Sequence, residues 1–283
     1  MLHSERCREA APAAVYATLL DEGTYLCAER SMYRVRAAAQ EVRERRDQTR
    51  HPAYTRPELL ATRPNELWSW DITKLLGPTQ WPSFSLYVIL DVCSRSVVGW
   101  TLCPRETAEL AQDFIGETAA NQPIDPDTRT LHADRGSSMT STPVAFLLAD
   151  LGITKSHSRP HVSNDHPYAE SQCKTLQYRP AFPVRCASME EARACCQIFC
   201  AWDNTVHRHR GIGLHTPAAV HYGLATARQE LRGATLTSAY TAHPERFVRQ
   251  PPTPPALPTA AWINKPAQPP REEVAEMPQP KAP

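Results

Sequence analysis

Leu67-Trp68-Ser69-Trp70-Asp71-Ile72-Thr73 is the stretch that decides the fold class of this 283-residue chain. It alternates and is rich in aromatic and β-branched residues, which predicts a β-strand. Two apolar runs follow, at 86–92 and 96–102, and the residues 93–95 between them are few enough for an antiparallel hairpin. The core is therefore expected to begin with antiparallel strands.

Downstream of the hairpin, the pattern alternates between helices and short strands. Helices are predicted at about 107–121, after Ser141 or Thr142, around Glu170, and from Met189 to about Asn204, with short strands at 130–133 and 152–155. Strands that are first antiparallel and then alternate with helices favour a mixed α/β sheet that is covered on both faces.

The N-terminal region predicts two helices, one around 13–20 that ends at Gly23 and one that runs through Met32 into a basic stretch. Between positions 29 and 50 there are seven arginines and four acidic residues. We therefore interpret residues 1–50 as a helix-turn-helix-like DNA-binding module, with Arg30, Arg34 and Arg43 offered to DNA phosphates. The alternative is a solvated helix face.

The remaining segments differ in composition. Residues 51–63 are polar and interrupted by proline, as in a linker, and precede a predicted core over 64–225 and a helical extension over 226–250. In the tail at 251–283, eleven of 33 residues are proline, which predicts an extended or disordered segment. Trp262-Ile263-Asn264 is the one part of this tail expected to dock.

Composition excludes several classes of protein. Hydrophobic residues make up 41% and charged residues 22%, no apolar run reaches the roughly 20 residues of a membrane span, and no signal-peptide pattern is present, so a cytoplasmic protein is expected. The nine cysteines include no C-x-x-C pair. Cys196, Cys200, His207 and His209 could form a zinc site, but reduced cysteines packed on a helix are favoured.

Three acidic residues stand at positions suited to chemistry. Asp71 lies within the first strand, Asp134 follows the strand at 130–133, and Glu170 lies on a helix 35 residues further on. Such placement can bring three carboxylates to one edge of the sheet, where divalent cations could bind. Two such ions, roughly 3.5–4 Å apart, support in-line displacement at phosphorus. Each acid taken alone is more often a turn or salt-bridge residue.

Several local motifs resemble one family, the transposases of the insertion-sequence-three type, whose second reading frame carries an integrase-like core. The similar segments are Asn65–Thr73, Leu90–Arg95, His132–Ser137, Ser158–Pro160 with Tyr168–Ser171, and Asn204–Pro217. The resemblance covers about residues 12–225 and extends into 243–247.

The resemblance implies a ribonuclease-H-like fold, a five-stranded mixed sheet with helices on both sides. It implies that Asp71, Asp134 and Glu170 bind two Mg²⁺ (or Mn²⁺) ions, so that water and then a DNA 3′-hydroxyl attack phosphodiesters without a covalent enzyme intermediate. The implied partners are terminal inverted repeats, target DNA and further copies of the chain on DNA, in a cytoplasmic, nucleoid-associated setting. No membrane and no small-molecule cofactor is implied.

Residues near the third acid complete the expected site. Arg159, Asn164 and Lys174 are expected to touch DNA phosphates, although a solvated lysine is an alternative. His132 either orients a ligand or packs. The family usually has a Lys or Arg seven residues after the glutamate, where this chain has Gln177.

Two competing functions follow from these residues. Gln177 supports a catalytically impaired DNA-binding regulator of transposition, since glutamine supplies no charge to a phosphate. The third hypothesis, a host nuclease of the same fold, is disfavoured by the basic N-terminal module.

Overall fold

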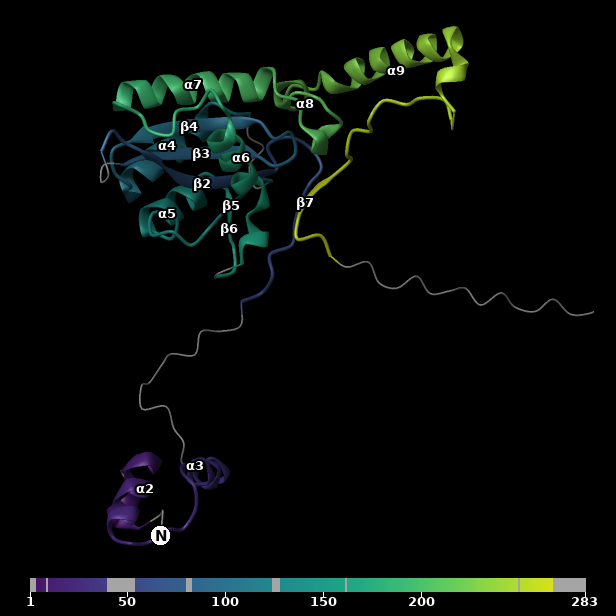
Figure 1. Cartoon of the computed structure of the whole chain (residues 1–283). Helices are drawn as coiled ribbons and strands as arrows, with labels where there is room; N and C mark the ends of the chain where they lie inside the picture. The colour runs from purple at the N-terminus through teal and green to yellow at the C-terminus, as the bar shows by residue number, and fades with distance from the viewer. Residues whose placement is uncertain are drawn as a thin grey trace, which may run out of the picture. The chain divides into compact units, whose positions relative to one another are not determined.

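The computed structural model describes residues 4–8, 10–39, 54–79, 83–123, 128–160, 162–248 and 250–266. The chain divides into two compact units, Met1–Tyr54 and Thr55–Pro283, and each is described by itself (Figure 1).

The N-terminal unit is helical. It contains α1 (Glu5–Arg8), α2 (Pro12–Asp21) and α3 (Glu29–Ala38). Its small core is formed by Cys7, Val15, Leu19 and Met32, which are buried together. Gly23 follows α2 with a φ of 72°, a left-handed conformation that glycine adopts at little cost, and so allows the chain to turn toward α3.

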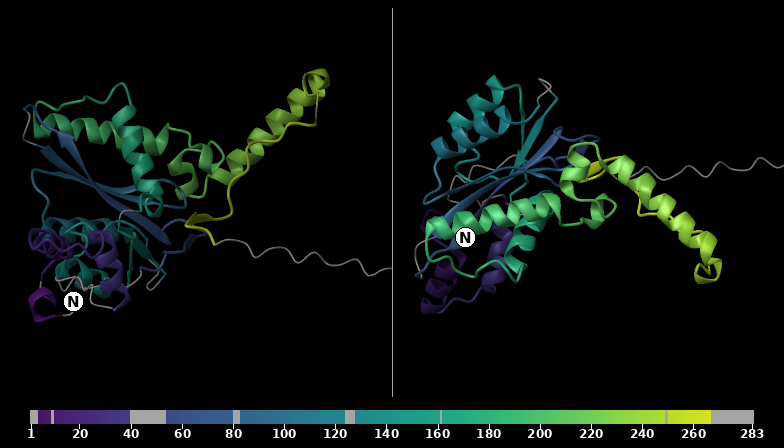
Figure 2. Two further views of the ribbon diagram at one scale, coloured as in Figure 1. Left: turned by 60° about the horizontal axis from the view of Figure 1, so that its bottom comes forward. Right: turned by 90° about the horizontal axis from the view of Figure 1, so that it is seen from above.

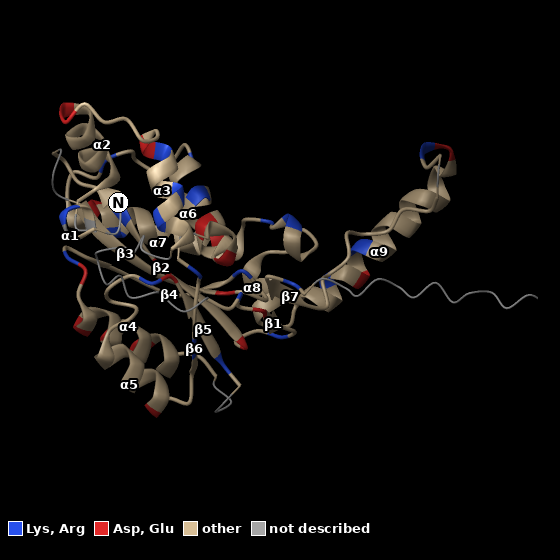
Figure 3. Cartoon of the chain, turned by 90° about the horizontal axis from the view of Figure 1, so that it is seen from below, with Lys and Arg blue, Asp and Glu red and all other residues tan. Residues whose placement is uncertain are grey.

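The arginines of α3 divide into two groups. Arg30 and Arg34 are exposed, and Figure 3 shows basic segments along this helix. Arg36 instead donates a hydrogen bond to the carbonyl of Ala10 at 2.9 Å and therefore helps to hold the unit together. Arg43 lies outside the described residues.

The second unit is built on a five-stranded sheet in the order β4-β3-β2-β5-β6 over its described residues. The strands are β2 (Leu67–Leu76), β3 (Ser83–Asp91), β4 (Val97–Cys103), β5 (Thr130–Ala133) and β6 (Thr154–His157). The pairs β2–β3 and β3–β4 are antiparallel, whereas β2–β5 and β5–β6 are parallel. The predicted mixed, ribonuclease-H-like sheet is confirmed.

Helices cover both faces of this sheet (Figure 2). α4 (Ala108–Ala120) and α5 (Thr142–Asp150) pack on one face, and α6 (Pro167–Tyr178) and α7 (Met189–Thr205) on the other. The alternation along the strands explains the two cores, because Trp68, Trp70, Tyr87 and Ile89 face α4 and α5 whereas Leu75, Leu86, Val88 and Leu90 face α6 and α7. Burying each of these large side chains contributes about 1.5–3 kcal/mol.

The segment that follows the core runs outward and returns. It contains α8 (Pro217–His221), α9 (Ala225–Ala242) and the 3₁₀ turn η3 (Pro244–Arg246). Two other 3₁₀ turns lie earlier in the chain, η1 (Ser163–Asp165) before α6 and η2 (Arg210–Ile212) before α8. The Gln229 amide on α9 donates to the carbonyl of Pro255 at 2.8 Å, which ties the returning chain to the helix. In the described ranges, every helix is too short or too polar to cross a membrane.

The structure corrects the predicted linker and the predicted disordered tail. β1 (Leu59–Ala61), within the expected linker, pairs antiparallel with β7 (Ala261–Ile263), within the expected tail. Ala61 and Ile263 are fully buried there, against Leu67 and Val92 of the sheet unit. At 261–263 the tail is therefore an ordered, extended strand and not a disordered segment, and Trp262-Ile263-Asn264 docks as expected. Residues 267–283 lie outside the described part of the chain.

Replacing Ile263 by Ala is expected to lower the free energy of unfolding by about 2 kcal/mol, because it leaves a cavity under the two-stranded sheet. The midpoint of thermal unfolding should fall by roughly 4–8 °C. Val248→Ala is the matched control, since Val248 is 93% exposed. Equal midpoints for the two variants would contradict the docked tail.

Candidate functional site

The strand register places Asp71 and Asp134 side by side. In the parallel pair of β2 and β5, Trp70 lies opposite Ala133, and the two aspartates are the next residues along each chain. Asp71 shares its side of β2 with Ser69 and Leu75, which is the side covered by α6. The sheet thus presents two carboxylates at the edge where α6 begins.

Glu170 lies in the first turn of α6 and lines the same cleft as Asp134. The cleft has a volume of about 730 Å³ and is also lined by Arg135, Arg159 and His166. Asp134 is exposed and Glu170 is half-buried, so both carboxylates can be reached by a ligand from solvent.

Cys173 connects Asp71 to this region. Its thiol donates a hydrogen bond to Asp71 Oδ2 at 3.3 Å, and it lies one helical turn after Glu170. Burial, with the negative charges of Asp71 and Glu170 adding to it, raises the pKa of Cys173, so the thiol stays protonated at neutral pH. Asp71 therefore lies beside Asp134 in the strand register and contacts Cys173, while Glu170 shares a cleft with Asp134.

A buried ion pair supports one wall of the cleft. Asp165 is fully buried and accepts hydrogen bonds from Arg159 Nε at 2.8 Å, Arg159 Nη2 at 3.0 Å and Asn264 Nδ2 at 2.6 Å. The Arg159 guanidinium holds the pKa of this carboxyl well below its usual range. Through Asn264, the pair also ties the chain after β7 to the cleft.

His132 packs behind the cleft rather than lining it. It is fully buried, its Nε2 donates to the carbonyl of Asp165 at 2.8 Å, and its ring stacks on that of His166 at 5.5 Å. Burial, with His166 adding to it, lowers the pKa of His132 to about 4, so the ring is neutral at physiological pH. Of the two roles left open for His132, the structure supports packing.

The other residues that are expected to contact DNA lie on different elements and differ in exposure. Arg159 lines the cleft, but two of its guanidinium nitrogens donate hydrogen bonds to Asp165. Asn164 is exposed in η1, and Lys174 is exposed on α6 one turn after Glu170. Gln177 lines a separate cavity beside Lys74.

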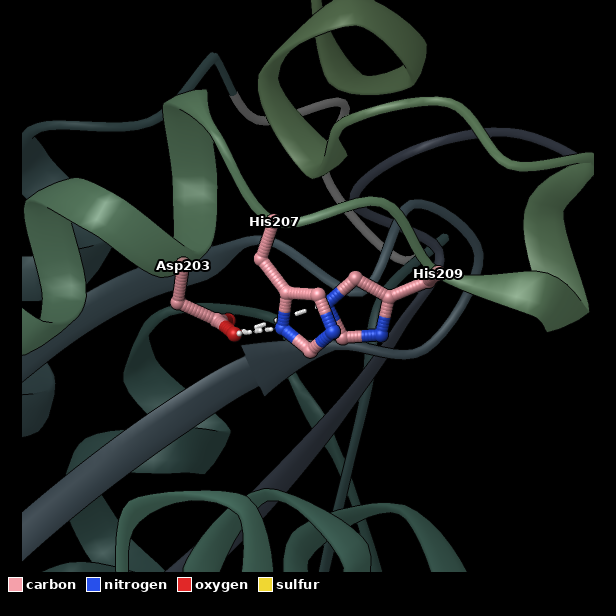
Figure 4. Close-up of side chains that lie close together, drawn as sticks. All are labelled: Asp203, His207 and His209. Atoms are coloured by element: carbon pink, nitrogen blue, oxygen red, sulfur yellow. Dashed lines mark hydrogen bonds and ion pairs between the residues drawn. The ribbon is translucent and has the colours of Figure 1, made fainter. Parts of the chain in front are cut away.

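One cluster was missed by the sequence analysis. Asp203, His207 and His209 converge at the end of α7 (Figure 4). Cys196 and Cys200, the cysteines considered together with these histidines, are instead buried in the core beneath α7. The available signal was the short distance along the chain between Asp203, near the end of α7, and the two histidines that follow the helix.

Comparison with protein families agrees with this architecture. Two family models described as an integrase core domain match the chain, one at residues 61–163 and one at residues 151–217. Together they span β2 to β6 and the helices that carry Glu170 and Asp203. The chain therefore contains an integrase core domain over residues 61–217.

The resemblance to insertion-sequence transposases is confirmed. The chain is 29% identical over 172 residues to the transposase for insertion sequence element IS904 of Lactococcus lactis, which covers 58% of this chain and 66% of that protein. It is 30% identical over 161 residues to the transposase InsF for insertion sequence IS3A of Escherichia coli, covering 56% of this chain and 55% of that one. The chain thus spans between half and two thirds of the length of these relatives.

A solved structure of the simian T-cell lymphotropic virus intasome in complex with a PP2A regulatory subunit contains a similar chain. The two share 19% sequence identity over 74% of each chain, with a TM-score of 0.46.

Proposed function

We propose that this protein is a DNA transposase that cleaves DNA at the ends of an insertion sequence and joins those ends to target DNA. Asp71, Asp134 and Glu170 are its catalytic residues. The observation that carries the proposal is the shared cleft of Asp134 and Glu170, with Asp71 beside Asp134 in the strand register. The relationship to insertion-sequence transposases gives the same reaction class.

The donor set fits a hard divalent cation such as Mg²⁺ or Mn²⁺. Such ions prefer a few carboxylate oxygens and keep water and phosphate oxygens as their other ligands. Asp134 accepts one hydrogen bond from the backbone N–H of Gly136 at 2.8 Å, which leaves further lone pairs on its carboxylate. Two bound ions would activate an attacking oxygen and stabilise the leaving oxygen in an in-line displacement.

Each group of side chains at the cleft has its own role in this proposal. Asp71, Asp134 and Glu170 would hold the ions. The backbone hydrogen bond from Ile72 N–H to Asp71 Oδ1 at 2.9 Å orients the Asp71 carboxylate. The Asp165–Arg159 pair keeps the wall of the cleft in place. Attack by water or by a DNA 3′-hydroxyl needs no protein nucleophile, which agrees with a cleft lined by acids and arginines.

DNA is held, in this proposal, by basic and polar side chains on both units. Arg30 and Arg34 on α3, together with Arg43, contact phosphates from the helix-turn-helix-like module, with α3 offered to the major groove. Arg159, Asn164 and Lys174 contact DNA near the cleft. Two DNA ends must be brought together for joining, so the active form is a homo-oligomer on DNA.

The competing proposal is a regulator that binds the ends without cutting them. It is favoured by Gln177, which is exposed on α6 and supplies no positive charge there. The two proposals differ in one product, joined DNA.

The test uses the full chain, Mg²⁺ or Mn²⁺, and duplexes copied from the two ends of the insertion sequence that encodes it. A transposase nicks these ends and joins them to a second duplex, whereas duplexes with scrambled ends give no product. Binding to the ends without any metal-dependent product would support the regulator and overturn the transposase.

A further inference from the structure

Asp203, His207 and His209 form a compact cluster, and none of the three lines the proposed catalytic cleft. Asp203 lies in the last turns of α7 and is fully buried, while the two histidines follow in the chain that leads to η2. One ligand atom from each residue lies within 4.8 Å of the others (Figure 4).

Both imidazole rings direct a nitrogen at one carboxylate oxygen. His207 Nδ1 donates a hydrogen bond to Asp203 Oδ1 at 2.8 Å, and His209 Nε2 lies 3.5 Å from the same oxygen. His209 Nε2 is buried and makes no hydrogen bond there, and a buried nitrogen without a partner is costly. Two nitrogens and one oxygen that converge in this way have the arrangement of a cation site.

Neighbouring side chains hold the three residues in this arrangement. Gln172 on α6 donates to Asp203 Oδ2 at 2.9 Å, which turns Oδ1 toward the histidines. The His207 ring stacks on Trp202 with 4.7 Å between centroids, and the Arg179 guanidinium lies 3.8 Å from the Trp202 ring centroid. Groups that orient a metal ligand from outside are typical of metal sites in proteins.

We propose that Asp203, His207 and His209 bind one divalent cation of the Zn²⁺ class. Two imidazoles and one carboxylate suit this class, whereas Mg²⁺ prefers oxygen ligands alone. Neighbouring ligands of a tetrahedral zinc ion, each about 2.0–2.1 Å from the metal, lie about 3.3 Å apart. The observed separations of 2.8 and 3.5 Å fall on either side of this value.

The fourth position of such an ion would open toward solvent. His209 also lines a cavity of about 420 Å³ with Arg95, Tyr168 and Gln172, which has room for a water ligand. The ion would tie the end of α7 to the following loop and, through Gln172, to α6. This site is separate from the three acids and stands whether or not the chain is a transposase.

The test is calorimetric titration of the metal-stripped full chain with zinc chloride alone, in the presence of excess Mg²⁺ to occupy oxygen-only sites. One equivalent of zinc should bind. His207→Phe keeps the ring stacked on Trp202 but removes the ligand nitrogen, and should weaken binding at least about 100-fold, because losing a residue that only orients a ligand already costs about 10–100-fold. His243→Phe, at a half-exposed histidine beyond α9, is the matched control and should bind zinc like the wild type.

Circular dichroism of both variants checks that they fold. Replacing zinc by Co²⁺ gives a second readout, because the proposed ligands produce no thiolate-to-cobalt charge-transfer absorption. Absence of zinc binding, unchanged binding in His207→Phe, or a thiolate band from the cysteines would each overturn the proposal.

Discussion

Replacing Asp134 by Asn is expected to lower the rate of metal-dependent cleavage and joining on the order of 1,000-fold. Asp134 is exposed at the end of β5 and lines the cleft with Glu170, so the change removes a negative charge from the proposed ion site and little packing. A bound ion contributes several kcal/mol to the stability of the transition state, and about 4 kcal/mol corresponds to this factor. The measurement is the rate of product formation on duplexes with the correct ends.

Asp150→Asn is the matched control, because Asp150 is an exposed aspartate at the end of α5, away from the cleft residues. It should cleave at the wild-type rate. Binding of Asp134→Asn to the same duplexes and its thermal unfolding should both stay close to those of the wild type. Wild-type cleavage by Asp134→Asn would remove this residue from the catalytic site.

Replacing Asp165 by Ala is expected to lower the free energy of unfolding by about 3–5 kcal/mol. The carboxylate is fully buried, and its loss leaves the Arg159 guanidinium without its buried partner and the Asn264 amide without an acceptor. Urea denaturation measures the change, with the exposed Asp113→Ala on α4 as the matched control. A loss under about 1 kcal/mol would show that the pair does not support the cleft.

Two further measurements separate this ion pair from a general packing effect. The double variant Arg159→Ala with Asp165→Ala should be less destabilised than the sum of the single variants, because the unpaired charge is then absent. The lowered pKa of Asp165 predicts that its contribution is fully present above the unfolded-state pKa of about 3.9 and is lost as the pH falls below it. Asp165→Asn should lack this acid-dependent part.

The sheet could be predicted from the sequence because its signals are local. The alternation around Trp68 and Trp70 and the short turn before Val97 are each contained within a few residues, and both reappear as β2 and the β3–β4 hairpin. Asp71 and Asp134 could be placed for the same reason, since each belongs to a strand or to the residue just after one.

The pairing of β1 with β7 could not be predicted in this way. Each strand has only three residues, and Leu59 and Ile263 are about two hundred positions apart, so neither segment shows a period of its own. Among the described residues of the tail, 251–260 form no helix or strand, in line with their proline content, but the partner strand that orders 261–263 lies elsewhere in the chain.

The contacts between side chains could not be predicted from the sequence either. The DNA contact of Arg159 stays a prediction, but the pairing of its guanidinium with Asp165, six residues on, was not predicted, although a buried carboxylate needs a partner. The helical spacing of Cys196 and Cys200 is compatible with a pair of metal ligands, but both lie on the side of α7 that faces the sheet. His207 and His209 instead lie next to Asp203, and a search for cysteine and histidine ligands does not consider an aspartate.

The most direct test of the central claim compares joined DNA product from Asp71→Asn, Asp134→Asn, Glu170→Gln and the variant with all three changes. If the three carboxylates hold the ions together, each single variant should be about as inactive as the triple variant, since residues that act as a unit are not additive. All four should still bind the DNA ends. Joining near the wild-type rate by any single variant would contradict a catalytic site made of Asp71, Asp134 and Glu170.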